Sequence, residues 1–276
     1  MRIRIIDAFT DRPFAGNPAA VCLLDADTWP DEAWMQQVAA ELHLSETAFA
    51  HPLPAGAQDD ADWALRWFNT VVEERMCGHA TLATVHALHT AGAIAGTVRF
   101  STASGVLAGR AAGDGVITLD FPAAPVSPVP VASALSRALG TTPDETYSAG
   151  SLGDVVAVLP DEAAVRSLRP DMSALAEFTT VEGLRGITVT AAANDAADGY
   201  DFVSRFFSPA SGLPEDPVTG SAHTALAALW SARLGRDELV GLQASARSGI
   251  VRTRVVGDRV LLTGHAVTTL EGTLSC

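Results

Sequence analysis

Hydrophobic and polar residues alternate along the first stretch of the chain, a period typical of β-strands. The segments RIRIIDA (2–8) and AVCLL (20–24) predict two strands, and the stretch between them, with Gly16 and Asn17, predicts a turn. This start has no continuous apolar core of the kind found in signal peptides, so we expect none.

The rest of the first half alternates between strand-like and helical patterns. One helical pattern places Trp34, Val38 and Leu42 on a single face, the spacing of an amphipathic helix. The expected order is a helix from Pro30 to His43, strands at 47–50 and 63–68, a helix from Gly78 to Gly92, and strands at 97–100 and 115–121.

A proline-rich stretch then divides the chain. FPAAPVSPVP (121–130) has four prolines in ten positions, which favours an extended, semi-rigid connector. We expect an N-terminal domain over 1–121, a linker over 122–130 and a C-terminal domain over 131–265, with the tail 266–276 returning to the first domain. In the second domain the patterns predict helices at 131–139, near 161–168 and at 220–235, and strands at 154–159, 186–190, 201–207 and within 247–265.

The two halves of the chain contain similar short segments. Arg66-Trp67-Phe68 precedes the helix that starts at Gly78, and Arg205-Phe206-Phe207 precedes the helix that starts at Gly220. Such short similarities also arise by chance, so the sequence alone leaves both internal duplication and coincidence open.

The charge pattern excludes several classes of function. The net charge is −14, all 18 basic residues are arginine, and they form no cluster, so nucleic acid is not an expected partner. No apolar run is long enough to span a bilayer, and we expect a cytoplasmic protein without a membrane partner. The absence of lysine excludes Schiff-base chemistry on a lysine, including pyridoxal phosphate held in that way.

The cysteines indicate neither a disulfide framework nor a metal centre. Cys22, Cys77 and Cys276 are widely separated, odd in number and form no Cys-x-x-Cys pair. We therefore expect reduced thiols and no bound metal.

The two helix starts are the most informative feature for function. A glycine at a helix N-terminus lets a ligand approach the unpaired backbone N–H groups, which favour an anion. Gly78 and Gly220 could thus hold a carboxylate, whereas the alternative is that both are only permissive turn residues.

Residues able to handle protons lie near these starts. Cys77 and His79 flank the first glycine, while Asp216 precedes and Ser221 follows the second. Glu46 has apolar neighbours, an environment that favours a raised pKa and general acid/base work. Each of these residues taken singly also fits a structural role, as a turn former, a helix cap or a core side chain.

Several segments closely resemble the PhzF-like family and, more distantly, the diaminopimelate epimerases. They are IIDAFTDRPFAGNPAAV (5–21), LSETAF (44–49), RWF and CGHATLATVHAL within 66–88, and RFFSPASGLPEDPVTGSAHTALA (205–227). The resemblance implies an α/β (mixed α+β) fold of two similar domains, each a mostly antiparallel sheet or barrel wrapped around a central helix. It also implies an active site in the cleft between the domains.

The same resemblance implies roles for individual residues. Glu46 would be the principal acid/base, assisted by Asp216, His79 and Ser221, while Ser45, Gly78, Gly220 and Asn17 would line the substrate site. The implied activity is that of a cofactor-independent, biosynthetic isomerase that moves a proton on a small carboxylic acid. The resemblance also implies a homodimer.

Two other functions stay open. Diaminopimelate epimerases use one cysteine in each half, and Cys77 stands where the first would be, whereas Asp216 occupies the neighbourhood of the second. A thiol-assisted epimerase or racemase would pair Cys77 with Glu46 or Asp216. A non-catalytic protein that binds small acids is the third reading, although it would have no need of a positioned acid/base.

Overall fold

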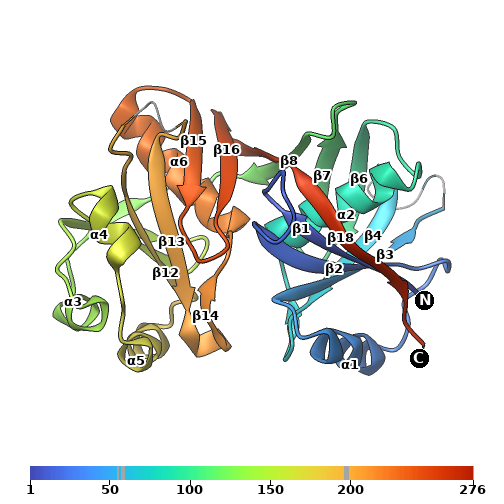
Figure 1. Cartoon of the computed structure of the whole chain (residues 1–276), viewed down its shortest axis with the longest axis horizontal. Helices are drawn as coiled ribbons and strands as arrows, with labels where there is room; N and C mark the ends of the chain where they lie inside the picture. The colour runs from blue at the N-terminus through green and yellow to red at the C-terminus, as the bar shows by residue number, and fades with distance from the viewer. Residues whose placement is uncertain (55, 57–59, 196–198, 276) are drawn as a thin grey trace. The chain divides into compact units, whose positions relative to one another are not determined.

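The chain folds into two units of mixed α and β structure, and most of their elements are labelled in Figure 1. The computed structural model describes residues 1–54, 56, 60–195 and 199–275. Unit 1 contains Met1–Asp120 and Thr263–Cys276, and unit 2 contains Phe121–Leu262. Among the described residues, no helix is both long and apolar enough to cross a membrane.

Unit 1 wraps its strands around one buried helix, α2. Its elements are β1 (Arg2–Ala8), β2 (Asn17–Leu23), α1 (Glu32–Leu42), β3 (Glu46–Pro52), β4 (Trp63–Phe68), β5 (Glu73–Glu74), α2 (Gly78–Thr90), β6 (Thr97–Thr102), β7 (Gly105–Ala111), β8 (Ile117–Pro122) and β18 (Ala266–Thr273). Helix α2 contacts β1, β2, β3 and β7, and ten of its thirteen residues are buried. A helix this apolar on all sides must lie inside a core.

Unit 2 also has a buried helix, α6. Its elements are β9 (Ser127–Val129), α3 (Ser133–Leu139), β10 (Glu145–Ala149), β11 (Asp154–Val158), α4 (Glu162–Ser167), α5 (Met172–Glu182), β12 (Gly186–Ala192), β13 (Phe202–Ser208), the 3-10 turn η3 (Pro209–Ser211), β14 (Leu213–Asp216), α6 (Gly220–Leu234), β15 (Glu238–Gln243), β16 (Gly249–Val256) and β17 (Arg259–Gly264).

The two faces of the unit 2 sheet carry separate cores. Val203 on β13 packs in a cluster with buried apolar residues of α3, α4 and α5, whereas its neighbour Phe202 packs with Leu226 and Trp230 of α6. Successive strand residues point to opposite faces, so β13, which is covered on both faces, is buried along its whole length.

Strand pairing is the same in the two units. The antiparallel pairs of unit 1, β1–β2, β3–β4, β4–β5 and β6–β7, correspond to β10–β11, β12–β13, β13–β14 and β15–β16 of unit 2. The parallel pairs β2–β3 and β4–β6 correspond to β11–β12 and β13–β15. The fold class predicted from the family resemblance is confirmed, and the repeated topology supports the internal duplication that the sequence left open.

Several elements were not predicted. The proline-rich stretch includes a short strand, β9, in which Pro128 pairs with Tyr147 at the end of a sheet, where a missing N–H is tolerated. The segment 172–182 forms helix α5, whose start was signalled by Asp171, since its carboxylate accepts the N–H groups of Ser173 and Ala174. Strands β10, β15 and β18 were also missed, and β18 pairs with β1 within unit 1.

Candidate active site

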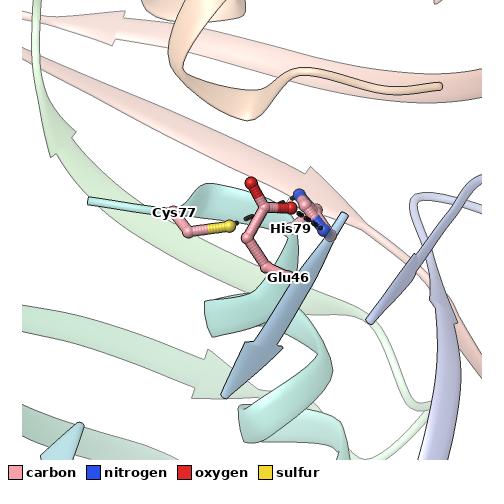
Figure 2. A group of neighbouring side chains, drawn as sticks. All are labelled: Glu46, Cys77 and His79. Atoms are coloured by element: carbon pink, nitrogen blue, oxygen red, sulfur yellow. Dashed lines mark hydrogen bonds and ion pairs between the residues drawn. The ribbon is translucent and has the colours of Figure 1, made fainter. Parts of the chain in front are cut away.

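The start of α2 brings three predicted site residues together (Figure 2). Glu46 is the first residue of β3, Cys77 is the N-cap of α2, and His79 is the second residue of that helix. One ligand-type atom of each lies within 4.8 Å of the others. Side chains from a strand and a helix 31 residues later are thus held against one another by the packing of α2 on β3.

His79 lies between the other two side chains. Its Nε2 is 3.1 Å from Oε2 of Glu46, and its Nδ1 is 3.4 Å from Sγ of Cys77. The imidazole side chain is only 4% exposed and the carboxylate side chain 16% exposed. A carboxylate, an imidazole and a thiol in this order form a chain through which a proton can pass.

Burial and the neighbouring charges set the protonation of this group. Burial raises the pKa of Cys77 to about 11, and the negative charge of Glu46 adds to this, so the thiol is protonated near neutral pH. Burial lowers the pKa of His79, whereas the negative charge of Glu46 and the hydrogen bonds with Cys77 and Glu46 raise it, and its pKa lies well above the ordinary value. We therefore assign an imidazolium–carboxylate pair beside a neutral thiol, three groups that titrate together.

Two more predicted residues extend this group, Ser45 by a contact with His79 and Asn17 by a contact with Ser45. Ser45 Oγ is 3.3 Å from Nε2 of His79 and donates to Oδ1 of Asn17 at 3.1 Å. Asn17 is fully buried at the start of β2. Gly16, just before it, has φ +64°, and a Cβ there would lie 2.1 Å from the carbonyl oxygen of Ala8. Only glycine fits this close approach, which explains the GN pair of the sequence.

The same three side chains could supply ligand atoms to a divalent cation. Thiolate, imidazole and carboxylate are ligands that zinc accepts. However, the two nitrogens of His79 face different partners, Cys77 on one side and Glu46 on the other. One imidazole nitrogen cannot replace both contacts, so this geometry fits a proton relay better than a three-ligand metal site.

In unit 2, Asp216 ends β14 just before α6, and its side chain is buried. Its Oδ2 accepts a 2.5 Å hydrogen bond from Oγ1 of Thr219, the N-cap residue of the helix. Gln243 of β15 donates to the carbonyl of Asp216 at 2.8 Å and accepts from the N–H of Thr219 at 2.8 Å. Gln243 was not predicted, because nothing in its local sequence indicates that it reaches this turn.

Ser221, the second residue of α6, is held by an ion pair that the sequence did not reveal. Arg185 donates from Nη1 to Oγ of Ser221 at 2.8 Å and from Nε to Asp154 at 2.9 Å. Burial raises the pKa of Asp154, although Arg185 opposes the shift. Two residues far apart in sequence, at the starts of β11 and β12, thus meet at the start of α6.

The predicted residues therefore form one group in each unit. Asn17, Ser45, Glu46, Cys77, Gly78 and His79 gather at the start of α2, and Asp216, Gly220 and Ser221 gather at the start of α6. In both helices the N-cap side chain forms no capping hydrogen bond, so it leaves the first amides to other partners.

Two further histidines and a second cysteine contact structural partners. His86 lies 3.1 Å from Oγ1 of Thr268, and Cys22 is buried in the core under α1. His223 is fully buried in α6 with Nδ1 2.8 Å from the carbonyl of Thr219. Cys276 lies outside the described residues.

Comparisons with known proteins agree with this fold and site. An uncharacterized isomerase of Pseudomonas aeruginosa is 43% identical over 275 residues, covering 98% of this chain and 96% of that protein. An uncharacterized isomerase of Halalkalibacterium halodurans is 41% identical, with 99% and 97% covered. The crystal structure of a PhzF-family phenazine biosynthesis protein from Enterococcus faecalis has 38% identity and a TM-score of 0.88, covering 100% of this chain and 99% of that one.

The sequence profile of the family described as phenazine biosynthesis-like protein matches residues 6–272. Together with two relatives named isomerases and the PhzF-family structure, this match extends over nearly the whole length of the chain. The chain belongs to the PhzF family of isomerase-type enzymes, which confirms the resemblance that its sequence segments indicated.

Proposed function

We propose that this isomerase removes a proton from a carbon atom of a small carboxylic acid and returns a proton to another carbon, with Glu46 as the base. The observation that carries the proposal is the Glu46–His79 contact of 3.1 Å at the N-terminus of α2. A carboxylate with limited solvent access, next to a group that can hold or release a proton, is suited to general acid/base catalysis.

The residues of unit 1 supply the parts that such a reaction needs. Glu46 takes the proton as a C–H bond breaks, and the electron pair moves into the adjacent unsaturated system. His79 stabilises the carboxylate and can pass a proton along the chain, and the first amides of α2 favour the negative charge that develops on the substrate. A new C–H bond forms at the second carbon, so no oxidant or reductant is consumed.

The residues of unit 2 have assisting roles in this proposal. The family resemblance assigns Asp216 and Ser221 to the catalytic machinery and Gly220, with Gly78, Ser45 and Asn17, to substrate binding. The reaction class requires neither an organic cofactor nor a metal, because proton transfer and charge stabilisation are supplied by side chains and backbone amides. The substrate we propose is a small cyclic or unsaturated carboxylic acid.

Deuterium uptake tests the role of Glu46. The protein is incubated in D2O with a panel of small cyclic and unsaturated carboxylic acids, and mass spectrometry follows both isomer formation and deuterium at carbon. Glu46→Gln keeps the shape but removes the base, so turnover should fall at least roughly 100-fold. Glu41→Gln, on the exposed side of α1, is the matched control. An active Glu46→Gln variant would refute the proposal.

One observation favours a second candidate, a thiol-assisted epimerase. Cys77 Sγ lies 3.4 Å from Nδ1 of His79, the spacing of a thiol and its activating base. Against it, the pKa of Cys77 near 11 keeps the thiol protonated, and the corresponding position of unit 2 holds Thr219. A mechanism with one thiol in each half therefore lacks its second thiol at that position.

We also propose that the protein is a homodimer, on the family resemblance alone. Light scattering should give twice the 28.6 kDa mass of one chain. A mass equal to one chain at all protein concentrations would contradict this.

A further inference from the structure

A buried ion pair in unit 2 reaches one of the proposed catalytic residues. Asp154 is 1% exposed, and Arg185 binds both of its carboxylate oxygens, from Nε at 2.9 Å and from Nη2. The remaining terminal nitrogen, Nη1, donates to Ser221 Oγ at 2.8 Å. The guanidinium therefore connects the starts of β11 and β12 to the start of α6.

The surroundings fix the plane of this guanidinium. Its central carbon lies 5.1 Å from the ring centroid of Phe206, a cation–π contact. The ring occupies space that Gly186 leaves open, since a Cβ at this glycine would lie 2.4 Å from Cζ of Phe206. The bidentate bond to Asp154 and the ring together leave Arg185 little freedom to turn.

The direction of the hydrogen bond decides what the Ser221 hydroxyl can do. An arginine can only donate, so Ser221 Oγ accepts from Arg185 and its own hydrogen must point elsewhere. Among the described residues, Ser221 Oγ donates no hydrogen bond, whereas the next hydroxyl of the helix, Thr224, donates to the carbonyl of Ser221. The hydroxyl is thereby prepared to donate to an anionic ligand.

Unit 1 has the same contact at the corresponding positions. Ser45, the residue before β3, contacts His79, the second residue of α2. Arg185, the residue before β12, contacts Ser221, the second residue of α6. In both units the residue before the strand orients the residue at the helix start, although the chemical groups differ.

We propose that Arg185 and Asp154 are positioning residues that fix the Ser221 hydroxyl as a hydrogen-bond donor to the carboxylate of the substrate. This inference rests on the proposed function, because it assumes that Ser221 meets the ligand. Asp154 holds the guanidinium, and Arg185 acts through Ser221 without itself being the ligand contact.

A double-mutant cycle on ligand binding tests the proposal. Benzoate is titrated into ¹⁵N-labelled protein, and its dissociation constant is measured from the amide shifts of Gly220 and Ser221. Ser221→Ala removes one hydrogen bond to a carboxylate and should weaken binding roughly 10-fold. Arg185→Gln should weaken it by a similar factor, and the double variant should be no weaker than either single variant.

Matched variants separate positioning from folding. Arg166→Gln removes a guanidinium from another buried carboxylate of unit 2, that of Glu162, and should leave benzoate binding unchanged. If Arg185→Gln fails to fold, Asp154→Asn combined with Arg185→Gln removes both charges and should show the same loss of binding.

Several outcomes would overturn the proposal. They are additive losses in the cycle, full affinity in Arg185→Gln or in the neutral pair, and no benzoate-dependent shifts at Gly220 and Ser221 of the unaltered protein. Benzoate transfers no proton, so this cycle and the deuterium experiment on Glu46 can fail separately.

Discussion

At the start of α2 in unit 1 stand Cys77 and His79, and at the start of α6 in unit 2 the corresponding positions hold Thr219 and Ser221. The strand framework around them is the same. Ala19 on β2 lies opposite Glu46 on β3, and Asp154 on β11 lies opposite Gly186 on β12.

The difference lies in the charge that each helix start receives. In unit 1 the strand position next to the helix carries a carboxylate, Glu46, which contacts the imidazole of His79 at the helix start. In unit 2 the equivalent strand position is Gly186, and the charge comes from Arg185, one residue earlier. One framework thus supports a proton-transfer group in unit 1 and a neutral donor oriented by a cation in unit 2. The comparison teaches that topology fixes where a functional group stands but not which chemistry it has.

The largest expected effect contrasts the second residue of each helix. His79→Gln removes a titratable group from the proton chain, so turnover in the deuterium assay should fall at least roughly 100-fold. Ser221→Ala removes one hydrogen bond, so turnover in the same assay should fall only roughly 10-fold. Equal losses for the two variants would show that the helix starts are not specialised as we describe.

The next effect is on stability and concerns Thr81 and His223, the residues four positions after the N-caps of α2 and α6. Thr81 in α2 donates to the carbonyl of Cys77, and His223 in α6 contacts the carbonyl of Thr219 in the same way. Burial lowers the pKa of His223 to about 4, so its neutral form is favoured in the folded protein. The contribution of the neutral His223 to the free energy of unfolding is complete above the ordinary pKa of about 6.5 and is lost as the pH falls toward 4.

The free energy of unfolding should therefore decrease by about 3 kcal/mol more between pH 7.5 and pH 4 than it does in a variant without this histidine. His223→Thr, which copies Thr81, is that variant, and urea unfolding at the two pH values measures the difference. The same decrease in both proteins would mean that His223 is not the group responsible.

The smallest expected effect concerns Cys77. A thiol with a pKa near 11 stays protonated, so Cys77→Ala should keep turnover within roughly threefold, and iodoacetamide should react slowly with the unaltered protein. Its counterpart at the start of α6 is Thr219, which has no thiol. A dead Cys77→Ala beside an active Glu46→Gln would assign the chemistry to the thiol instead.

Much of the fold could be predicted because its signals are local. The buried helices start at Gly78 and Gly220 as their composition predicted, and α1 covers Glu32–Leu42 within the predicted range. Helix α5 was missed although Asp171 caps its start and Gly183 ends it in a left-handed conformation. Short strands such as β10 and β15 were missed although each pairs with the next strand along the chain, because stretches this short show too little alternation of apolar and polar residues to be recognised.

The sequence by itself determined the family, the mixed α/β class, the two buried helices and the residues at their starts, because the signal for each lies within continuous segments of the chain. Only the tertiary structure decided which side chains meet. Parallel pairing of β2 with β3, and packing of α2 on β3, bring Glu46 to His79. Parallel pairing of β11 with β12 brings Asp154 to Arg185, and Arg185 reaches Ser221 of α6. These contacts join residues 31 to 36 positions apart, and such distances are closed only when strands and helix share one core.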